Sequence, residues 1–332
     1  MPLEIQDVDL QDETALRAWW EVGSAATAER PGTPWPAWEV SRSALAADNP
    51  EYDMTLLGAF DGDAMVGSVM LLVPLHENLH TCSLNVYVLP SRRREGVGSR
   101  LVAAVEERAA SLGRTTLQSE GYVPSGESGP AELFAAARGY EVASREGIKE
   151  LTLSDYRSRR SDLVAAVADA ADDYTIVTFD TVCPDEHIAS FGRLLGMLMS
   201  EIPLGDLDLE DSEWTPERLR ASEQRCVGIG RHILAALAIA PDGSVAGSSD
   251  VRINEADPSH GQIGITLVDP AHRGHRLGMS LKIASHDLAL ATYPECASVD
   301  TCNAEVNEHM NAVNEALGYR SIETLLELQK RL

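Results

Sequence analysis

Short apolar runs and amphipathic segments follow one another in the same order in two parts of the chain. Residues 86–89 form an apolar run of β-branched and aromatic side chains, which predicts a strand, and Pro90 ends it because proline has no N–H to donate to a ladder. Leu101, Val105 and Leu112 then recur on one face, which predicts a helix. The same succession returns around Pro270, at a constant offset of 180 residues, and therefore predicts two copies of one unit.

The same periodicities, followed along the whole chain, predict the element order β-α-α-β-β-β-α-β-α-β, run twice. Asp12 is predicted to cap the first helix, and residues 140–142 and 148–153 are predicted to be two short strands. Residues 1–155 then form a first unit, residues 156–173 a linker helix and residues 174–332 a second unit. The proline-rich loop at residues 29–38 carries two tryptophans and is either a lid over an apolar pocket or a loop pinned to the core.

The composition describes an acidic chain that can build cores. Hydrophobic residues make up 44% of the 332 residues, and the formal net charge is −25. Nucleic acid and anionic membranes need a basic surface, so we expect neither as a partner. The charge fits either an acidic surface without a specific partner or a cationic substrate.

The sequence shows no targeting or metal-binding pattern. No apolar run approaches the length of a membrane span, and the N-terminus lacks the basic and apolar regions of a signal peptide. The five cysteines include no pair with metal-ligand spacing. We therefore expect a cytoplasmic protein with reduced thiols and no metal site.

The residues between each predicted strand and its helix suit a phosphate. Residues 93–98 read Arg-x-x-Gly-x-Gly, in which the glycines allow a close backbone approach. The first N–H groups of the helix and its partial positive charge favour a phosphate or pyrophosphate there. The second copy keeps Arg273 and Gly278 but has Arg276 at the first middle glycine, where the side chain either crowds the phosphates or contacts one.

Arg-x-x-Gly-x-Gly between a strand and a helix resembles the acyl-CoA signature of the GNAT superfamily of N-acyltransferases. Two copies resemble tandem GNAT proteins, with a layout similar to that of mycothiol synthase. The resemblance implies an α/β fold, an α+β mixed sheet in two tandem GNAT domains, with acetyl-CoA as the cofactor. It also implies that the turn binds the CoA pyrophosphate and that the preceding strand pairs with the pantetheine. The cofactor-binding residues so implied are Tyr87, Val88, Arg93, Arg94, Glu95, Gly96, Val97, Gly98, Ser99, Leu267, Val268, Arg273, Gly274, His275, Arg276, Leu277, Gly278, Asn303 and Asn307.

The acid and base that many members of the family carry are missing at their usual places. The base position on the fourth strand reads Asn85 and Gly264 in the two units, and the acid position reads Ala135 and Asn314. The second unit has asparagines at helical spacing instead, which form either an exposed polar face or a set of hydrogen-bonding groups for the thioester. Asn303 is predicted to cap that helix. The catalytic candidates are Asn307, Asn314, Thr266 and Thr301.

These features predict an N-acetyltransferase that moves an acetyl group from acetyl-CoA to a primary amine of a small cationic molecule. The alternative is a catalytically degenerate acyl-CoA-binding or sensing protein, because the usual acid and base are absent. An acidic loop at residues 201–211 favours a cationic acceptor in the second unit. We expect the second unit to be the catalytic one and the first to be degenerate, because residues 118–120 end the first unit's fifth strand without a polar helix face after them. The sequence is compatible with a monomer and with a homodimer.

Overall fold

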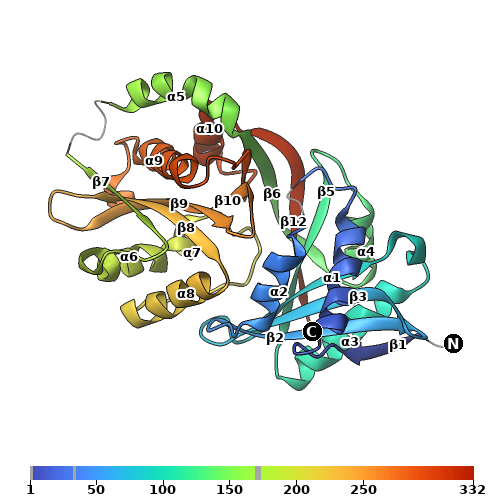
Figure 1. The fold of residues 1–332 in the computed structure, drawn as a ribbon. Coiled ribbons are helices and arrows are strands. Elements are labelled where there is room, and N and C mark those ends of the chain that lie inside the picture. The colour runs from blue at the N-terminus through green and yellow to red at the C-terminus, as the bar shows by residue number, and fades with distance from the viewer. Residues whose placement is uncertain (1–2, 33–34, 169–172) are drawn as a thin grey trace. The chain divides into compact units, whose positions relative to one another are not determined.

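The computed structural model describes residues 3–32, 35–168 and 173–332, which divide into two compact units (Figure 1). Unit 1 comprises Met1–Glu146, Leu204–Leu209 and Glu323–Leu332, and unit 2 comprises Gly147–Pro203 and Glu210–Ile322. We expected the first unit to end at residue 155 and the second to begin at residue 174. The observed unit 1 ends earlier and also takes residues 204–209 and 323–332 from later in the chain.

The elements follow the predicted order in both halves of the chain. The first half consists of β1 (Glu4–Asp7), α1 (Glu13–Thr27), α2 (Trp38–Ala46), β2 (Tyr52–Asp61), β3 (Ala64–Pro74), β4 (Thr81–Val88), the short 3-10 helix Pro90–Arg92, α3 (Val97–Ser111), β5 (Thr116–Pro124), α4 (Pro130–Ala137) and β6 (Glu141–Thr152). Asp12 caps α1 as predicted, because its side chain accepts hydrogen bonds from the N–H groups of Thr14 and Ala15.

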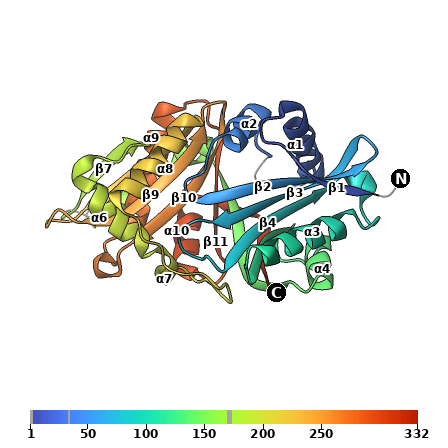
Figure 2. The same ribbon diagram turned by 90° about the horizontal axis from the view of Figure 1, so that it is seen from below.

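The strands of unit 1 lie in the order β1-β2-β3-β4-β5-β12-β6, where β12 (Arg320–Arg331) is the last strand of the chain. Neighbours along β1 to β4 are antiparallel, β4 and β5 are parallel, and β12 is antiparallel to β5. Helices α1 and α2 cover one face of this sheet, and α3 and α4 cover the other (Figure 2). We refer to these as the α1–α2 face and the α3–α4 face.

Alternation along the strands separates the two cores of unit 1. Val69 and Leu71 of β3 point to the α3–α4 face, where Leu101 and Val105 of α3 pack against them. Met70, which lies between them in the strand, points to the other face and packs against the smaller core under α1 and α2. Leu326 and Leu328 of β12 complete the larger core, so the end of the chain is part of the hydrophobic interior of unit 1.

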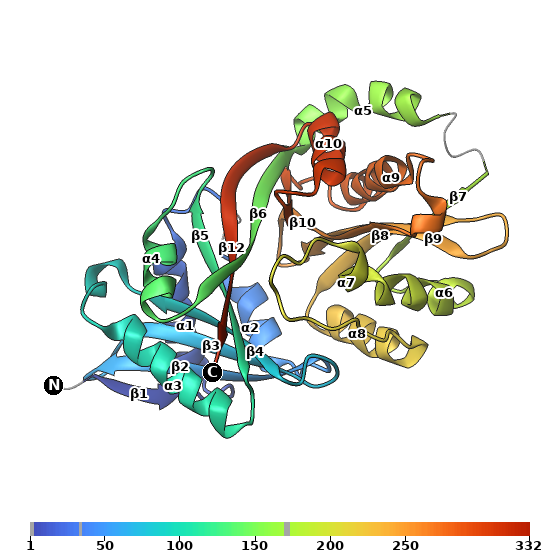
Figure 3. The same cartoon turned by 180° about the vertical axis from the view of Figure 1, so that it is seen from behind.

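Strand β6 corrects the prediction of two short strands at residues 140–142 and 148–153. The structure has a single strand over Glu141–Thr152, next to β12 (Figure 3). The polar stretch 144–147 predicted a break, but Gly147 is not among the glycines with a positive φ, and nothing turns the chain there. A strand with a neighbour on each side satisfies its backbone groups throughout, and this overrides the weak local signal.

The strands of unit 2 lie in the order β6-β11-β10-β9-β8-β7. Its elements are α5 (Leu153–Val167), β7 (Thr175–Asp180), α6 (Asp185–Gly196), α7 (Leu198–Glu201), α8 (Pro216–Gly228), β8 (Arg231–Ile239), β9 (Val245–Asn254), β10 (Asp257–Val268), the 3-10 helix Pro270–His272, α9 (Leu277–Thr292), β11 (Ser298–Ala304) and α10 (Glu308–Leu317).

The segment that we expected to link the units is helical up to Val167, and its residues 169–172 lie outside the described residues. Helix α5 belongs to unit 2, where Tyr156 and Leu163 are buried in the core with Ile283 of α9. The Tyr156 hydroxyl donates to the Ile283 carbonyl at 3.1 Å and contacts Asp287 at 2.9 Å. Helix α5 is therefore part of the core of unit 2. Throughout the described part of the chain, no helix has both the length and the apolar character that crossing a membrane requires.

The position of β12 makes a prediction about stability. Leu326 is fully buried in unit 1, so Leu326→Ala should lower the free energy of unfolding by about 2–5 kcal/mol. Hydrogen exchange followed by mass spectrometry should accelerate in β3 and β5 while β8 and β9 stay protected. Leu332→Ala, at a half-exposed position, is the control and should change neither. Faster exchange confined to β8 and β9 would contradict the placement of β12.

Candidate functional site

A cleft opens in unit 1 where β4 and β5 separate. The two strands pair in parallel from Thr81 and Thr116 to Leu84 and Ser119, and the pairing stops there. Beyond this point both strands continue, to Val88 and Pro124, and a cavity of about 660 Å³ lies between them. The backbone of β4 at this edge is left for a ligand, because strand groups without a neighbour need another hydrogen-bonding partner.

The wall of the cavity on the α3–α4 face is apolar. Val97 and Val102 of α3, Phe134 of α4 and Tyr140 line it, together with Leu328 of β12. Burial holds the pKa of the Tyr140 hydroxyl above its usual range, so this group is neutral. Such a wall suits an extended ligand whose polar groups lie along its chain and bond to the strand edge.

The turn before α3 forms one mouth of the cavity. Gly96, at φ +85°, occupies the N-cap position of α3, and Arg94 at φ +69° also lies in the left-handed region. The N–H groups of the first turn of a helix have no partner within the helix, and they attract anions. A side chain at Gly98 would meet Phe134 at 3.3 Å and Val88 at 3.4 Å, both of which line the cavity.

The three arginines of this turn have different roles. Arg92 forms ion pairs with Asp61 at 3.0 Å and Glu95 at 2.8 Å. Arg93 donates to the carbonyl of Ala26 at 2.9 Å and so ties the turn to the end of α1. Arg94 lies exposed on the turn and lines the cavity, which places a cation beside the helix N-terminus.

The α1–α2 face supplies the polar end of the cavity. Arg30 forms an ion pair with Glu323 of β12 at 2.9 Å, and its guanidinium carbon lies 3.4 Å from the centre of the Tyr122 ring. The Tyr122 hydroxyl donates to the carboxylate of Glu120, and Tyr87 of β4 lines the same end. Burial, followed by the charge of Glu120, keeps the pKa of both tyrosines above the ordinary value.

The loop at residues 29–38 is pinned beside this end of the cleft. Trp35 lies edge-on to Tyr87, with 4.9 Å between ring centres, and contacts Trp19 of α1. The loop was predicted to be either a lid over a pocket or a loop pinned to the core, and these ring contacts match a pinned loop. Residues 33 and 34 lie outside the described residues.

Glu327 of β12 lies directly opposite Glu120 in the β5–β12 ladder. Burial is the largest cause that raises the pKa of Glu327, to about 8, and the charges of Glu120 and Glu146 add to it. Side chains directly opposite in an antiparallel ladder are close neighbours, so two ionised carboxylates there repel each other.

The turn before α9 in unit 2 has a left-handed N-cap residue like the turn before α3, but its side chains contact other residues of unit 2. Arg276 takes the N-cap position of α9 at φ +52°, and its guanidinium donates to the carbonyl of Ala166 in α5. Arg273 pairs with Glu201. Tyr174 contacts both histidines of this turn: its hydroxyl lies 3.1 Å from His272 Nδ1, and its ring centre lies 5.3 Å from that of His275.

Lys282 of α9 stands at the position that Val102 holds in α3, by the same offset of 180 residues. Its side chain is fully buried, and the ammonium lies 5.1 Å from the centre of the Tyr319 ring. Burial first, and then the charge of Lys149, lowers the pKa of Lys282 to about 7. At this position unit 1 has Val102, which lines the cavity, whereas unit 2 has the buried ammonium of Lys282.

The asparagines of unit 2 bond to one another. Asn303 lies in β11 and accepts from Asn314 at 2.9 Å and from Lys149 at 3.0 Å, while its own amide donates to Asn311 at 2.7 Å. The prediction that Asn303 caps the helix is wrong: Asn307 is the N-cap of α10 and accepts from the Met310 N–H. The chain stays in the strand up to Ala304, which leaves the capping position to the later asparagine.

The two threonine candidates are also held within unit 2. The Thr266 hydroxyl lies 2.9 Å from that of Ser249, and Thr301 is 4% exposed. The structure thus brings Asn303, Asn311 and Asn314 together in one partly buried network and leaves Thr266 in a separate contact. Their catalytic roles stay predictions.

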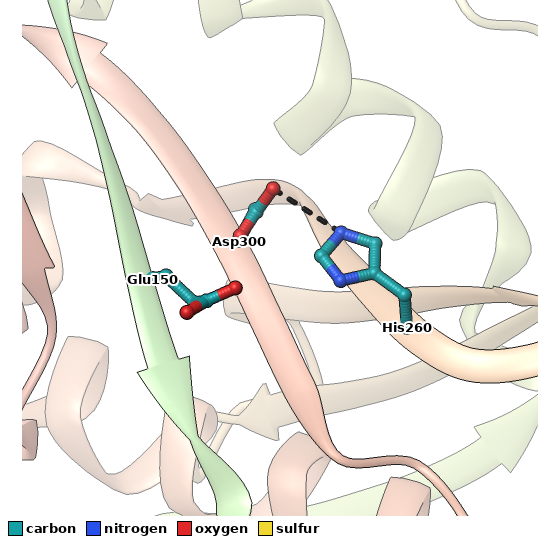
Figure 4. Close-up of side chains that lie close together, drawn as sticks. All are labelled: Glu150, His260 and Asp300. Carbon is teal, nitrogen blue, oxygen red and sulfur yellow. Dashed lines mark ion pairs between the residues drawn. The ribbon is translucent and has the colours of Figure 1, made fainter. Parts of the chain in front are cut away.

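Three potential metal ligands of unit 2 lie side by side on neighbouring strands, although the sequence predicted no metal site. They are Glu150 of β6, His260 of β10 and Asp300 of β11, with ligand atoms within 4.8 Å of one another (Figure 4). His260 Nε2 lies 3.2 Å from a carboxylate oxygen of Asp300, and its Nδ1 lies 3.1 Å from the Ser298 hydroxyl. This ion pair accounts for the burial of Asp300, and we assign no metal role to the group.

The sequence did not reveal Arg30, Glu120, Tyr122 and Glu327 as site residues. The prediction ended the fifth strand at residues 118–120, whereas β5 continues to Pro124 and carries Glu120 and Tyr122 on one face. The signal that could have found them is the alternation of polar Gln118, Glu120 and Tyr122. Glu327 gave no local signal, because its place beside Glu120 depends on a strand pairing across most of the chain.

Comparisons with known proteins agree with this architecture. Residues 18–123 match the family model of acetyltransferases of the GNAT family. A solved tandem GNAT protein from the clavulanic acid biosynthesis pathway, without acetyl-CoA, has 27% identity and a TM-score of 0.82, over 99% of this chain and 98% of that one. No match was found among the curated proteins.

Two further solved structures share the fold. A GCN5-related N-acetyltransferase from Sphaerobacter thermophilus has 16% identity and a TM-score of 0.66, covering 99% of this chain and 95% of that one. A putative acetyltransferase from Pyrococcus horikoshii has 14% identity and a TM-score of 0.55, covering 99% and 89%. The predicted α/β fold with two tandem GNAT domains is confirmed, and the family match supports acyltransferase activity.

The raised pKa of Glu327 predicts a pH dependence of stability. Between the ordinary pKa of 4.5 and about 8, folded unit 1 keeps a proton that the unfolded chain has released, so the free energy of unfolding falls as pH rises through this window. Glu327→Gln stays neutral and should reduce this fall. Urea unfolding at about pH 5 and about pH 8, followed by tryptophan fluorescence, measures it. An unchanged pH dependence in the variant would assign the effect to other groups.

Proposed function

Because the chain has the fold of a tandem GNAT protein, we propose that it transfers an acetyl group from acetyl-CoA to a primary amine of a small cationic molecule, and that the transfer takes place in the cleft of unit 1. The observation that carries this proposal is the cavity of about 660 Å³ between β4 and β5, which ends at the N-terminus of α3.

The residues of the cavity fit the parts of acetyl-CoA in order. The N–H groups of Val97, Gly98 and Ser99, with Arg94 beside them, suit the pyrophosphate. The free edge of β4 next to Tyr87 and Val88 suits the amides of the pantetheine, which would bond to it as an added strand. Acetyl-CoA supplies an already activated thioester, so positioning the amine accounts for much of the rate.

The contacts of the two turns favour unit 1 over unit 2, in contrast to our expectation from the sequence. In unit 2 the turn side chains are engaged by Ala166, Glu201 and Tyr174. Lys282 adds a buried polar group where the first cleft has Val102. Binding of CoA in unit 2 would require these contacts to be replaced, whereas the mouth of the first cleft already presents unbonded helix N–H groups.

The preference for a cationic acceptor rests on carboxylates other than those we had expected. In the acidic loop, Glu201 pairs with Arg273, and Asp208 pairs with His80 at 3.4 Å and Arg331 at 3.6 Å. The polar end of the first cleft instead carries Glu120, with Glu327 opposite it. Carboxylates in a partly buried site attract a cation and disfavour an anion.

A catalytically degenerate protein that only binds or senses acyl-CoA is the alternative. It is favoured by Asn85 and Ala135 at the usual base and acid positions of the unit with the open cleft. Both functions need acetyl-CoA to bind in unit 1, and release of free thiol in the presence of an amine separates them.

The first prediction locates the cofactor. Gly98→Val should place a side chain against Phe134 and Val88 in the cleft and weaken acetyl-CoA binding at least tenfold, or about 1.4 kcal/mol. Gly278→Val is the matched control, because it changes the equivalent position of the second turn, where a β-carbon would meet nothing within 4 Å. Calorimetry measures both. Loss of binding in the Gly278 variant alone would move the site to unit 2.

The second prediction concerns the acceptor. We expect thiol release from acetyl-CoA to be faster with 1,4-diaminobutane than with 4-aminobutanoate, by at least tenfold in kcat/KM. The two amines have the same chain length but opposite charges at the far end, and carboxylates near the reacting nitrogen favour the diamine. Equal rates, or faster reaction of the amino acid, would show that the carboxylates do not select the acceptor.

A further inference from the structure

We propose that Glu120 is the catalytic base of unit 1 and accepts the proton of a cationic amine at the divergence of β4 and β5. This proposal rests on the proposed acyl transfer in the same cleft. Among the described residues that line the cavity, Glu120 carries the single carboxylate, and none of the others is a histidine, cysteine or lysine. Glu120 is therefore the best candidate for a proton acceptor among these lining residues.

The strand register places Glu120 at the point where an acceptor meets the thioester. Leu84 and Ser119 are the last paired positions, so the next residues on the two strands are Asn85 and Glu120, on opposite sides of the opening. Asn85 stands at the usual base position of the family, and an amide cannot accept a proton there. Glu120 offers the missing group from the other side of the same opening.

Alternation along the strands places these groups on one face. Leu117 is buried in the core of the α3–α4 face, so Glu120 and Tyr122 project towards the α1–α2 face. Tyr87, whose ring contacts Trp35, projects from β4 to the same face. An amine bound on this face can approach the carboxylate while the cofactor lies against the apolar wall.

The carboxylate of Glu120 is held in place by its neighbours. The Tyr122 hydroxyl donates to it, and the Arg30 guanidinium covers the Tyr122 ring while it pairs with Glu323. Because burial and the charge of Glu120 keep the pKa of Tyr122 high, the hydroxyl stays protonated and donates at neutral pH. Tyr122 and Arg30 are positioning residues in this arrangement.

The charged groups that face Glu120 favour a cation and a proton acceptor. Glu327 of β12 lies opposite it, and Glu146 of β6 is close enough to raise the pKa of Glu327. Arg30 is the cation of this end, and its charge is engaged by Glu323. An ammonium group that binds here is attracted by the carboxylate of Glu120 and can give up one proton to it.

The step balances without another reactant. The ammonium transfers one proton to the carboxylate of Glu120, and the freed nitrogen lone pair attacks the thioester carbonyl carbon. A C–N bond forms and the C–S bond breaks, so CoA leaves as a thiolate. The second proton of the attacking nitrogen passes to the sulfur, and the proton on Glu120 returns to solvent with the exchange of products.

Two variants test the proposal with 1,4-diaminobutane as the acceptor and saturating acetyl-CoA. Glu120→Gln keeps the shape and the Tyr122 contact but cannot accept a proton, so kcat/KM should fall by about 100-fold or more, with acetyl-CoA affinity unchanged. Glu327 becomes charged only above about pH 8, so Glu327→Gln should lower kcat/KM for the cationic diamine above this pH more than below it. Glu127→Gln, which removes an exposed carboxylate after β5, is the control and should change neither.

The outcomes separate this proposal from the one it rests on. If acetyl-CoA fails to bind, or binding is insensitive to Gly98→Val, the proposed function in unit 1 fails. If acetyl-CoA binds but the wild-type chain releases no thiol with the diamine, or if Glu120→Gln keeps its rate and pH profile, then Glu120 is not the base. A loss of kcat/KM in Glu120→Gln with acetyl-CoA affinity retained, together with a loss above about pH 8 in Glu327→Gln, supports it.

Discussion

The divergence of β4 from β5 after Leu84 and Ser119 is the constraint on which the functional reading of this protein depends. A strand edge inside a protein must find partners for its N–H and C=O groups, and here the adjoining strand withdraws from it. The divergence therefore creates a cavity between the two strands and leaves a row of backbone groups to which a ligand can bond. It also opens a gap through which groups on opposite faces of the sheet can meet. Helix α3 begins at the end of this edge, and the N–H groups of its first turn would suit an anion at the mouth.

The two units differ in a few side chains around the same turn and helix. Both turns have a residue in the left-handed region at the helix N-cap, Gly96 in one and Arg276 in the other. Glycine leaves the mouth clear, whereas the arginine brings a guanidinium that bonds to the Ala166 carbonyl. Six residues further along each helix, Val102 contributes an apolar wall and Lys282 a buried ammonium. The backbone that suits a cofactor is thus kept in both units, while the side chains of unit 2 bond to their own chain.

The sequence predicted the fold well because its strongest signals are local and occur twice. The strand, proline, turn and helix around Pro90 and Pro270 fix the order of elements in both units, and the glycines of the first turn mark the anion site. The catalytic side of the cleft could not be predicted in the same way. Whether Glu120 lies in a strand depends on its pairing with β12, and the network around Asn303 depends on Lys149 of β6, so neither is visible in a local pattern. Three of the four asparagines that we expected on one helix face lie together, but they bond to one another and to Lys149, and Asn303 belongs to β11.

The placement of β12 ties the cleft of unit 1 to the last residues of the chain. Strand β12 lies between β5 and β6, and it supplies Leu328 to the cavity wall, Glu323 to Arg30 and Glu327 to the position opposite Glu120. Without this strand, β5 would be an exposed edge, and Glu120 would lose Glu327 as the residue opposite it in the ladder. Burial of Leu326 and Leu328 holds the strand in the core. Residues Glu323–Leu332 therefore both stabilise unit 1 and shape the polar end of its cleft. A truncation or substitution near the C-terminus therefore acts on the cleft formed by the first half of the chain, although it lies more than 200 residues away in the sequence from Glu120.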